Sequence, residues 1–253
     1  MKRTVTVLCS LILAMLSVFQ VFASEESTEV KMKNGYPVVT IESGIHYNGS
    51  YRSDIKQLAK AHPYEEYQGC ILFYGDSNFR LWKKFDDDFA GYNAINHGFG
   101  GSKAVDLVYY ANSALYPYQP AIVVIQNGLN DYEALTGTDE ERAQECLDYR
   151  KQMFEAFHEI MPDTDFLILS SILAPGRDEY LELAKMINDR TQALAEEYDY
   201  LYYVDSSALT YDGTGFHEEL FIEDGLHLTD EGRTKWADEY IKPALDEILA
   251  KRG

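Results

Sequence analysis

Short apolar runs alternate with longer helical patterns along most of this chain. The runs cover residues 70–74, 93–96, 121–126, 165–170 and 200–204. Runs of this length are typical of parallel β-strands covered on both faces, because such strands have no solvent-facing side. We therefore expect a buried sheet of five strands.

Helical patterns separate these runs. Between residues 139 and 161 apolar side chains recur at helical spacing, and Thr138 with Glu141 forms a capping box at the start. Further helices are expected over residues 52–62, 102–115, 178–198 and 229–250, the last of them kinked at Pro243. Strands that alternate with helices predict an α/β fold, a three-layer α/β/α sandwich around a mainly parallel sheet.

In such a sheet, ligands bind outside the carboxyl ends of the strands. The first polar segment at such an end is Gly75-Asp76-Ser77. The glycine permits a tight turn, and Ser77 then stands at the N-terminus of a helix, where free N–H groups stabilise negative charge. This geometry suits an exposed nucleophile, although an ordinary helix-capping serine would give the same three residues.

Two further polar segments follow the next two strands. Residues 96–102, NHGFGGS, contain glycines that let backbone N–H groups approach a ligand closely. They lack both the last glycine of a dinucleotide fingerprint and the G-K-[ST] of a P-loop. Residues 128–131, GLND, offer a side-chain amide that can donate to an oxyanion, with Asp131 available to brace the loop. Each segment is also compatible with a simple turn.

The fourth polar segment, Asp224 to His227, precedes the last predicted helix. A histidine base needs its Nε2 near the nucleophile and a carboxylate on its Nδ1–H. A three-residue separation across a tight turn can bring Asp224 onto the His227 ring. His217 is an alternative base, and an acidic surface loop is the alternative without catalytic meaning.

Together, the four segments resemble those of the SGNH (GDSL) hydrolase family, which would cover roughly residues 70–240. The stretches ILFYGDSNFRLW, INHGFGGS and EDGLHLTDEG are similar to a secreted or cell-envelope subgroup that acts on small esters, often on acylated carbohydrate. The resemblance implies a flavodoxin-like fold. The family's usual leucine after GDS is Asn78 here, a departure that does not touch the catalytic groups.

The resemblance also implies a role for each matching residue. Ser77 corresponds to the nucleophile, His227 to the general base, and Asp224 to the acid that orients the histidine. The oxyanion donors would be the backbone N–H groups of Ser77 and Gly101 and the side-chain amide of Asn130.

Two more residues near these segments are candidate substrate contacts. His97 lies between the second strand and the glycine loop, and Arg177 follows the fourth strand, on the rim where ligands bind. No metal or cofactor is expected, since metal-type Cys/His spacing is missing.

The resulting hypothesis is a secreted serine esterase that hydrolyses small acyl esters, above all acetyl esters on carbohydrate, through a Ser-His-Asp acyl-enzyme mechanism. Its partner would be a small-molecule or acylated carbohydrate ester. The alternatives are an acyltransferase that moves the acyl group to a sugar, and a non-catalytic carbohydrate-binding protein on the same fold.

The N-terminus has the pattern of a secretory signal peptide over residues 1–23. Lys2 and Arg3 precede an apolar run that ends in Val21-Phe22-Ala23, and cleavage is expected after Ala23. An uncleaved anchor is the alternative, because the run is near the lower limit for a membrane span. A polar lead-in over residues 24–45 and a hydrolase domain over residues 46–253 would follow.

Charge and cysteine content restrict the partners and the compartment. The formal net charge is −20, and loss of Lys2 and Arg3 with the signal peptide would make it −22. A surface with this much negative charge repels nucleic acid and anionic membranes. We therefore expect no binding to nucleic acid, and no stable association with a membrane after cleavage. Cys70 and Cys146 remain in the mature chain, and an oxidising compartment would permit one disulfide between them. Their positions in a strand and a helix favour the alternative of two unpaired core thiols.

Overall fold

The computed structural model describes residues 31–47 and 49–253, so the predicted signal peptide lies outside the described residues. Its main sheet has five strands in the order β4-β3-β5-β6-β7, and every neighbouring pair is parallel. In chain order these are β3 (Ile71–Gly75), β4 (Ala94–Gly98), β5 (Ile122–Gln126), β6 (Asp165–Leu169) and β7 (Leu201–Val204). The predicted α/β fold with its parallel sheet is confirmed.

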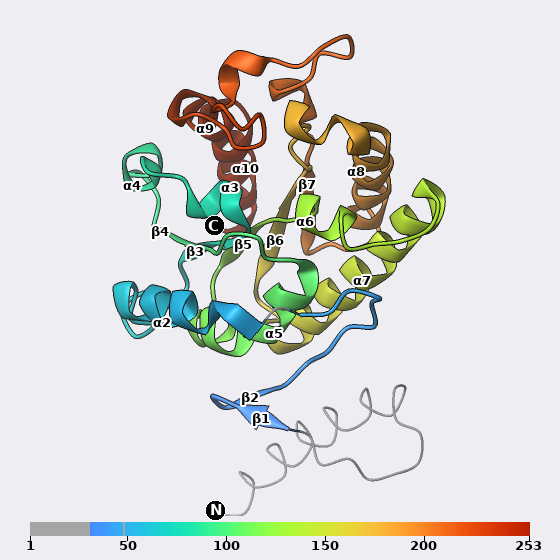
Figure 1. The fold of residues 1–253 in the computed structure, drawn as a ribbon. Helices are drawn as coiled ribbons and strands as arrows, with labels where there is room; N and C mark the ends of the chain where they lie inside the picture. The colour runs from blue at the N-terminus through green and yellow to red at the C-terminus, as the bar shows by residue number, and fades with distance from the viewer. Residues whose placement is uncertain (1–30, 48) are drawn as a thin grey trace, which may run out of the picture. The chain divides into compact units, whose positions relative to one another are not determined.

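Two layers of helices cover the two faces of this sheet (Figure 1). One face packs against α2 (Arg52–Ala61), α5 (Ala104–Ala114), α7 (Asp139–Ile160) and α8 (Leu181–Ala195). The other packs against α3 (Ser77–Arg80), α4 (Phe85–Asp88), α9 (Asp230–Trp236) and α10 (Lys242–Arg252). Successive residues of β3 belong to opposite cores. Leu72 and Tyr74 lie in the core on the first face, and Ile71 and Phe73 lie in the core on the second.

Several predicted helices have different ends from those expected. The helix expected over residues 178–198 begins with a 3₁₀ turn, η4 (Pro175–Tyr180), before α8. The helix expected over residues 229–250 is divided into α9, a π-helical turn η7 (Ala237–Ile241) and α10. Pro243 lies in the first turn of α10, directly after this π-helical turn, where its missing N–H removes one α-helical hydrogen bond.

The remaining elements are short. They are β1 (Met32–Lys33), β2 (Tyr36–Pro37), η2 (Gly49–Tyr51), η3 (Tyr116–Tyr118), α6 (Leu129–Tyr132), η5 (Ser207–Leu209) and η6 (Glu218–Leu220). None of the helices in the described part of the chain combines the length and apolarity that crossing a bilayer requires.

The residues before β3 are tied to the first helical layer. The side-chain amide of Asn112 in α5 donates to the carbonyl groups of Lys33, Tyr36 and Pro37, at 3.2, 3.1 and 3.0 Å. Ile45 is buried in the core on the same face of the sheet as α5. We call residues 33–69 the N-terminal segment; part of the polar lead-in expected over residues 24–45 thus packs on the domain.

Both cysteines of the described chain are buried and free, as predicted. Burial raises the pKa of the thiol to about 12 for Cys70 and for Cys146. Neither side chain has the partly exposed, electropositive surroundings that make a cysteine reactive.

The close approach of β3 and β5 at Gly75 generates a stability prediction. A Cβ on Gly75 would lie 2.2 Å from the Gln126 carbonyl oxygen, whereas a Cβ on Gly91 would meet no atom within 4 Å. Gly75→Ala should lower the free energy of unfolding by about 3 kcal/mol, because the two strands must separate. Gly91→Ala should change it by less than about 0.5 kcal/mol. Urea titration of both variants measures the difference, and equal stabilities would contradict the tight strand contact.

Candidate active site

Ser77 stands where β3 ends and α3 begins. The side chain of Asp76 caps α3 by accepting a hydrogen bond from the Asn78 N–H at 2.9 Å. Gly98 on the neighbouring strand leaves room for this helix, since a Cβ there would lie 2.5 Å from the Arg80 nitrogen. The strand-turn-helix expected from the motif is therefore present, with the Ser77 side chain at the carboxyl end of the sheet.

His227 reaches Ser77 from the opposite end of the chain. Its Nε2 lies 2.9 Å from the Ser77 Oγ, and its Nδ1 lies 2.6 Å from Asp224 Oδ2. An ionised carboxylate can only accept, so Nδ1 carries the proton and Nε2 is free to accept from the serine hydroxyl. The structure thus brings Ser77, His227 and Asp224 together. His217, the alternative base, instead lies 3.7 Å from Glu219 and does not join them.

The turn between Asp224 and His227 fixes the carboxylate as well as the ring. Asp224 Oδ1 accepts from the N–H groups of Leu226 and His227 at 2.8 and 2.9 Å, and Gly225 supplies a positive φ of 63°. Partial burial acts to raise the pKa of Asp224. The hydrogen bonds from the His227 ring and the two N–H groups outweigh it and hold this pKa at about 2. Asp224 is therefore charged throughout the neutral range.

The glycine loop and the segment after β5 meet beside Ser77. Gly101 has a positive φ of 80°, which favours glycine, and Asn130 donates from Nδ2 to the Ser102 carbonyl at 3.1 Å. An amide carries two N–H bonds, so one can hold Asn130 in place while the other serves a ligand. Within the described residues, the N–H groups of Ser77 and Gly101 donate to no protein acceptor.

Two buried carboxyl groups lie directly behind these donors. Asp131 accepts from the Ala104 N–H at 3.0 Å and so ties the segment after β5 to the start of α5, the bracing role expected for it. Burial raises the pKa of Asp131 to about 6 and that of Asp76 to about 7. The charge of Asp131 contributes to the shift at Asp76, because two buried anions disfavour one another.

Arg233 is a positioning residue that the sequence did not reveal. It is buried in α9, where its Nε donates to the Asn78 carbonyl at 3.2 Å and its Nη1 to the Leu228 carbonyl at 2.5 Å. These carbonyls belong to the residues next to Ser77 and His227. One guanidinium therefore joins the segment that carries the serine to the segment that carries the histidine. In a predicted helix, an arginine is expected on the exposed face. No local sequence signal therefore indicated that Arg233 is buried.

The two expected substrate contacts have different outcomes. His97 is fully buried, and its ring nitrogens lie 2.8 Å from the Ala114 carbonyl and 3.2 Å from His62 Nδ1. The expectation that His97 lines a substrate site is corrected, because β4 points this side chain into the core. Arg177 lies in the 3₁₀ turn η4, after β6, and pairs with Glu133 at 2.6 Å, so its contact with substrate stays a prediction.

The raised pKa of Asp76 predicts how stability depends on pH. Between about pH 4 and 7 the unfolded chain releases this proton while the folded chain keeps it, so stability falls as pH rises through that window. Asp131 acts in the same direction. Asp76→Asn retains the helix cap and removes the titration, so the fall in Tm between pH 5 and 8 should shrink by about 5 °C. Thermal melting across pH tests this, with the exposed Asp87→Asn as control; equal slopes for all three proteins would contradict it.

Comparison with known proteins places this fold and site in context. The structure is similar to a GDSL-like lipase from Bacteroides thetaiotaomicron, with 21% identity, a TM-score of 0.59, and 78% of this chain and 96% of that chain covered. It is also similar to a family 3 carbohydrate esterase from Clostridium thermocellum, with 18% identity, a TM-score of 0.54, and 73% and 99% covered. No curated protein matches the sequence.

A family model extends these likenesses to the sequence itself. The GDSL-like lipase/acylhydrolase model matches residues 71–235, the part of the chain that runs from β3 into α9. This match contains all the residues gathered at the carboxyl end of the sheet. The chain belongs to the GDSL-like lipase/acylhydrolase family.

Proposed function

We propose that this protein is a secreted serine esterase that removes small acyl groups, acetyl above all, from carbohydrate. The observation that carries the proposal is the continuous hydrogen-bonded chain from Ser77 Oγ through His227 to Asp224, at 2.9 and 2.6 Å. A hydroxyl, an imidazole and a carboxylate in this order form the arrangement that activates a serine nucleophile. Membership of an acylhydrolase family supports ester hydrolysis as the reaction.

The reaction would proceed through an acyl-enzyme. His227 takes the proton of Ser77 as the Oγ attacks the ester carbonyl, and the tetrahedral intermediate collapses with loss of the alcohol, which receives that proton. Water then attacks the acyl-serine, with His227 again as base, and releases the carboxylic acid. Asp224 keeps the ring in the required tautomer and stabilises the imidazolium in both steps. Its low pKa suits that role, because it stays ionised while His227 gains and loses a proton.

The oxyanion would be held by the donors that surround Ser77. The N–H of Ser77 lies at the start of α3, Gly101 presents its N–H from a left-handed turn, and Asn130 contributes a side-chain N–H. Donors that are fixed before the reaction stabilise developing charge without reorganisation. The bonds from Asn130 to Ser102 and from Ala104 to Asp131 supply this rigidity.

Two parts of the proposal, the sugar ester as substrate and secretion as the location, rest on different observations. The fold is shared with a carbohydrate esterase, which supports a sugar ester as substrate. The Lys2-Arg3 pair, the apolar run and Ala23 support export. Transfer of the acyl group to a sugar would appear as an acylated oligosaccharide product, and hydrolysis as free carboxylic acid.

The nucleophile and its base can be tested by covalent labelling. A fluorophosphonate should label the unmodified protein at Ser77. Ser77→Ala should abolish labelling and hydrolysis of p-nitrophenyl acetate, since no other hydroxyl holds this place. His227→Ala should slow both by at least about 10³-fold, whereas His217→Ala should leave both unchanged. Full activity in Ser77→Ala, or labelling at another residue, would refute the proposal; a non-catalytic binding protein would not react at all.

Asn130→Ala should lower kcat by about 10²–10³-fold with little change in KM, because the lost N–H acts on the transition state. The Tm should change little, since the Asn130 side chain is partly exposed and the substitution removes its hydrogen bond to the Ser102 carbonyl. Steady-state kinetics on p-nitrophenyl acetate, with the Tm as the control for folding, measures both quantities. A loss below threefold would remove Asn130 from the oxyanion hole.

A further inference from the structure

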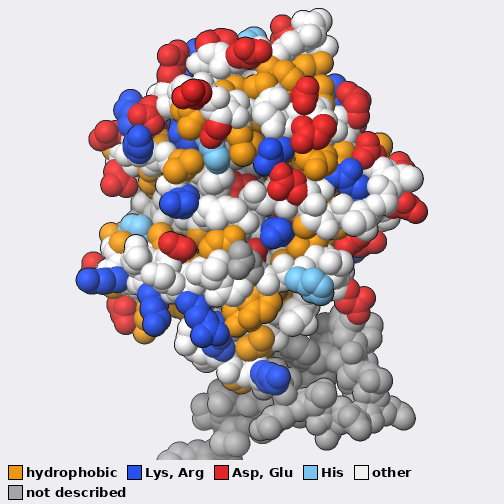
Figure 2. Space-filling view, in the orientation of Figure 1, with side chains coloured by type: hydrophobic (Ala, Val, Ile, Leu, Met, Phe, Trp, Pro, Cys, Tyr) orange, Lys and Arg blue, Asp and Glu red, His pale blue; other side chains and the backbone are white. Residues whose placement is uncertain are grey.

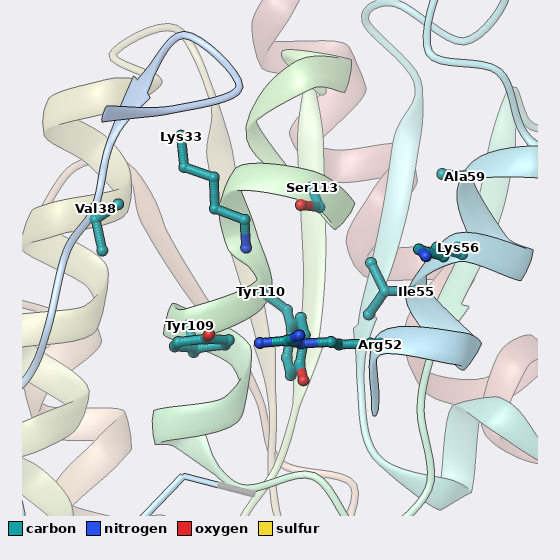
Figure 3. Close-up of a pocket in the computed structure, with 9 residues that line it drawn as sticks. All are labelled: Lys33, Val38, Arg52, Ile55, Lys56, Ala59, Tyr109, Tyr110 and Ser113. Carbon is teal, nitrogen blue, oxygen red and sulfur yellow. The ribbon is translucent and has the colours of Figure 1, made fainter. Parts of the chain in front are cut away.

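A pocket of about 400 Å³ lies between the N-terminal segment and α5. Figure 3 shows Lys33, Arg52 and Lys56 directed around it, with Ile55 on the α2 side and Tyr110 on the α5 side. The wall between the three cations is apolar and aromatic. A pocket of this kind suits a ligand with an apolar face and a negative charge.

The positive charge of the pocket contrasts with the charge of the protein. The chain has a formal net charge of −20, yet none of the described residues that line this pocket is acidic. Lys33, Arg52 and Lys56 form no ion pair with another described residue. Figure 2 shows Lys and Arg side chains gathered over α2, while Asp and Glu dominate the opposite end of the same face. These cations are thus available to an external anion.

Tyrosine side chains lie beside two of the cations, Lys33 and Arg52. The Lys33 Nζ lies 5.1 Å from the centre of the Tyr109 ring, and Tyr47 stacks on this ring at 4.0 Å. Hydrogen bonds to Tyr109 from Tyr47 and Arg52, with the charge of Lys33, lower the pKa of Tyr109. Lys33 and Arg52 therefore both lie beside the Tyr109 side chain.

The three cations of the pocket lie outside the part of the chain that the family model matches. They all precede residue 71, where the family match begins, and the matched domain supplies Tyr109, Tyr110 and Ser113 from α5. A second hollow, against Pro175 and the Asp224 turn, has the opposite character and is lined by Glu218, Glu223 and Asp224. Of these two hollows among the described residues, the first is the one that suits an anion.

One side chain separates this pocket from the proposed oxyanion loop. The Tyr51 hydroxyl lies 3.2 Å from the position that a Cβ would take on Gly101. The Tyr51 ring packs edge-on against Tyr110, a lining residue, with centroids 6.1 Å apart. The Tyr51 side chain therefore contacts both a wall of the pocket and the glycine loop that ends beside Ser77.

We propose that this pocket binds a uronic acid residue of the same polysaccharide whose ester Ser77 attacks. Its carboxylate would pair with Arg52, whose planar guanidinium matches a carboxylate, and with the flanking Lys33 and Lys56. Its C–H face would lie against Tyr110 and Ile55. The inference rests on the proposed esterase function and adds that the sugar chain is acidic.

Direct binding tests the pocket apart from catalysis. Isothermal titration with trigalacturonate, and with galactotriose of the same linkage as the neutral probe, should show at least a tenfold preference for the acid. The double variant R52Q/K56Q should lose this preference. Lys60→Gln removes one positive charge from α2 outside the pocket and should keep the preference within twofold. The preference should also weaken from 20 to 500 mM NaCl, because salt screens exposed charges.

Kinetics separates failure of this inference from failure of the esterase. R52Q/K56Q should raise KM for acetylated trigalacturonate about tenfold and leave kcat/KM for p-nitrophenyl acetate unchanged. Equal binding of acidic and neutral trisaccharides, equal loss in Lys60→Gln, or preference for a phosphorylated neutral sugar would overturn the uronate site. If these results came with normal p-nitrophenyl acetate hydrolysis, the esterase would stand; loss of the esterase would instead appear as unlabelled Ser77.

Discussion

The parallel pairing of three neighbouring strands is the constraint on which the site depends. β3 pairs with β4 and β5, and the register sets Gly75 level with Gly98 on one side and Gln126 on the other. Because the strands run in one direction, the segments that follow them emerge at one edge of the sheet. The serine turn, the glycine loop and the Asn130 segment meet there as a consequence of backbone hydrogen bonds, before any contact between their side chains. Absence of a Cβ at Gly75 makes this register possible, since the Gln126 carbonyl occupies that space.

Carboxyl groups of the same type have opposite properties in this site because their surroundings differ. Asp224 is partly exposed and accepts three hydrogen bonds, so its charge is stabilised. Asp76 and Asp131 are buried close together, and each takes one backbone hydrogen bond that does not outweigh the cost of burial. The charged carboxylate holds the His227 ring through Nδ1, whereas the two buried ones cap α3 and tie the Asn130 segment to the start of α5. The carboxyl group beside the imidazole is therefore distinct from the two that support the surrounding loops.

The parts of the fold predicted from the sequence are those that leave a local pattern. Buried strands give apolar runs, capped helices give Thr138 and Glu141, and turns that expose reactive groups give GDS and DGLH; in these cases the structure has the expected elements. Arg233, the burial of His97 and the cationic pocket left no such pattern, because each depends on which distant segment packs against it. The sequence of α9 contains nothing that distinguishes an arginine in solvent from one that bridges two carbonyl groups. Likewise, a histidine at the end of a strand can face either a cleft or the core, and only the side on which α5 packs decides.

The N-terminal segment packs on the domain without contributing a strand to the main sheet. Residues 33–69 are held by α5 and α7, through Asn112, Glu145 and Gln152, and end just before β3, where the family match begins. Because the segment precedes β3, a change in its sequence alters neither the order nor the register of the five strands. Ile55 and Tyr51 nevertheless pack in the core, and Tyr51 reaches Gly101, so such a change must preserve these contacts. The pocket-facing cations of the segment are therefore the positions that can change without moving the strands that carry Ser77.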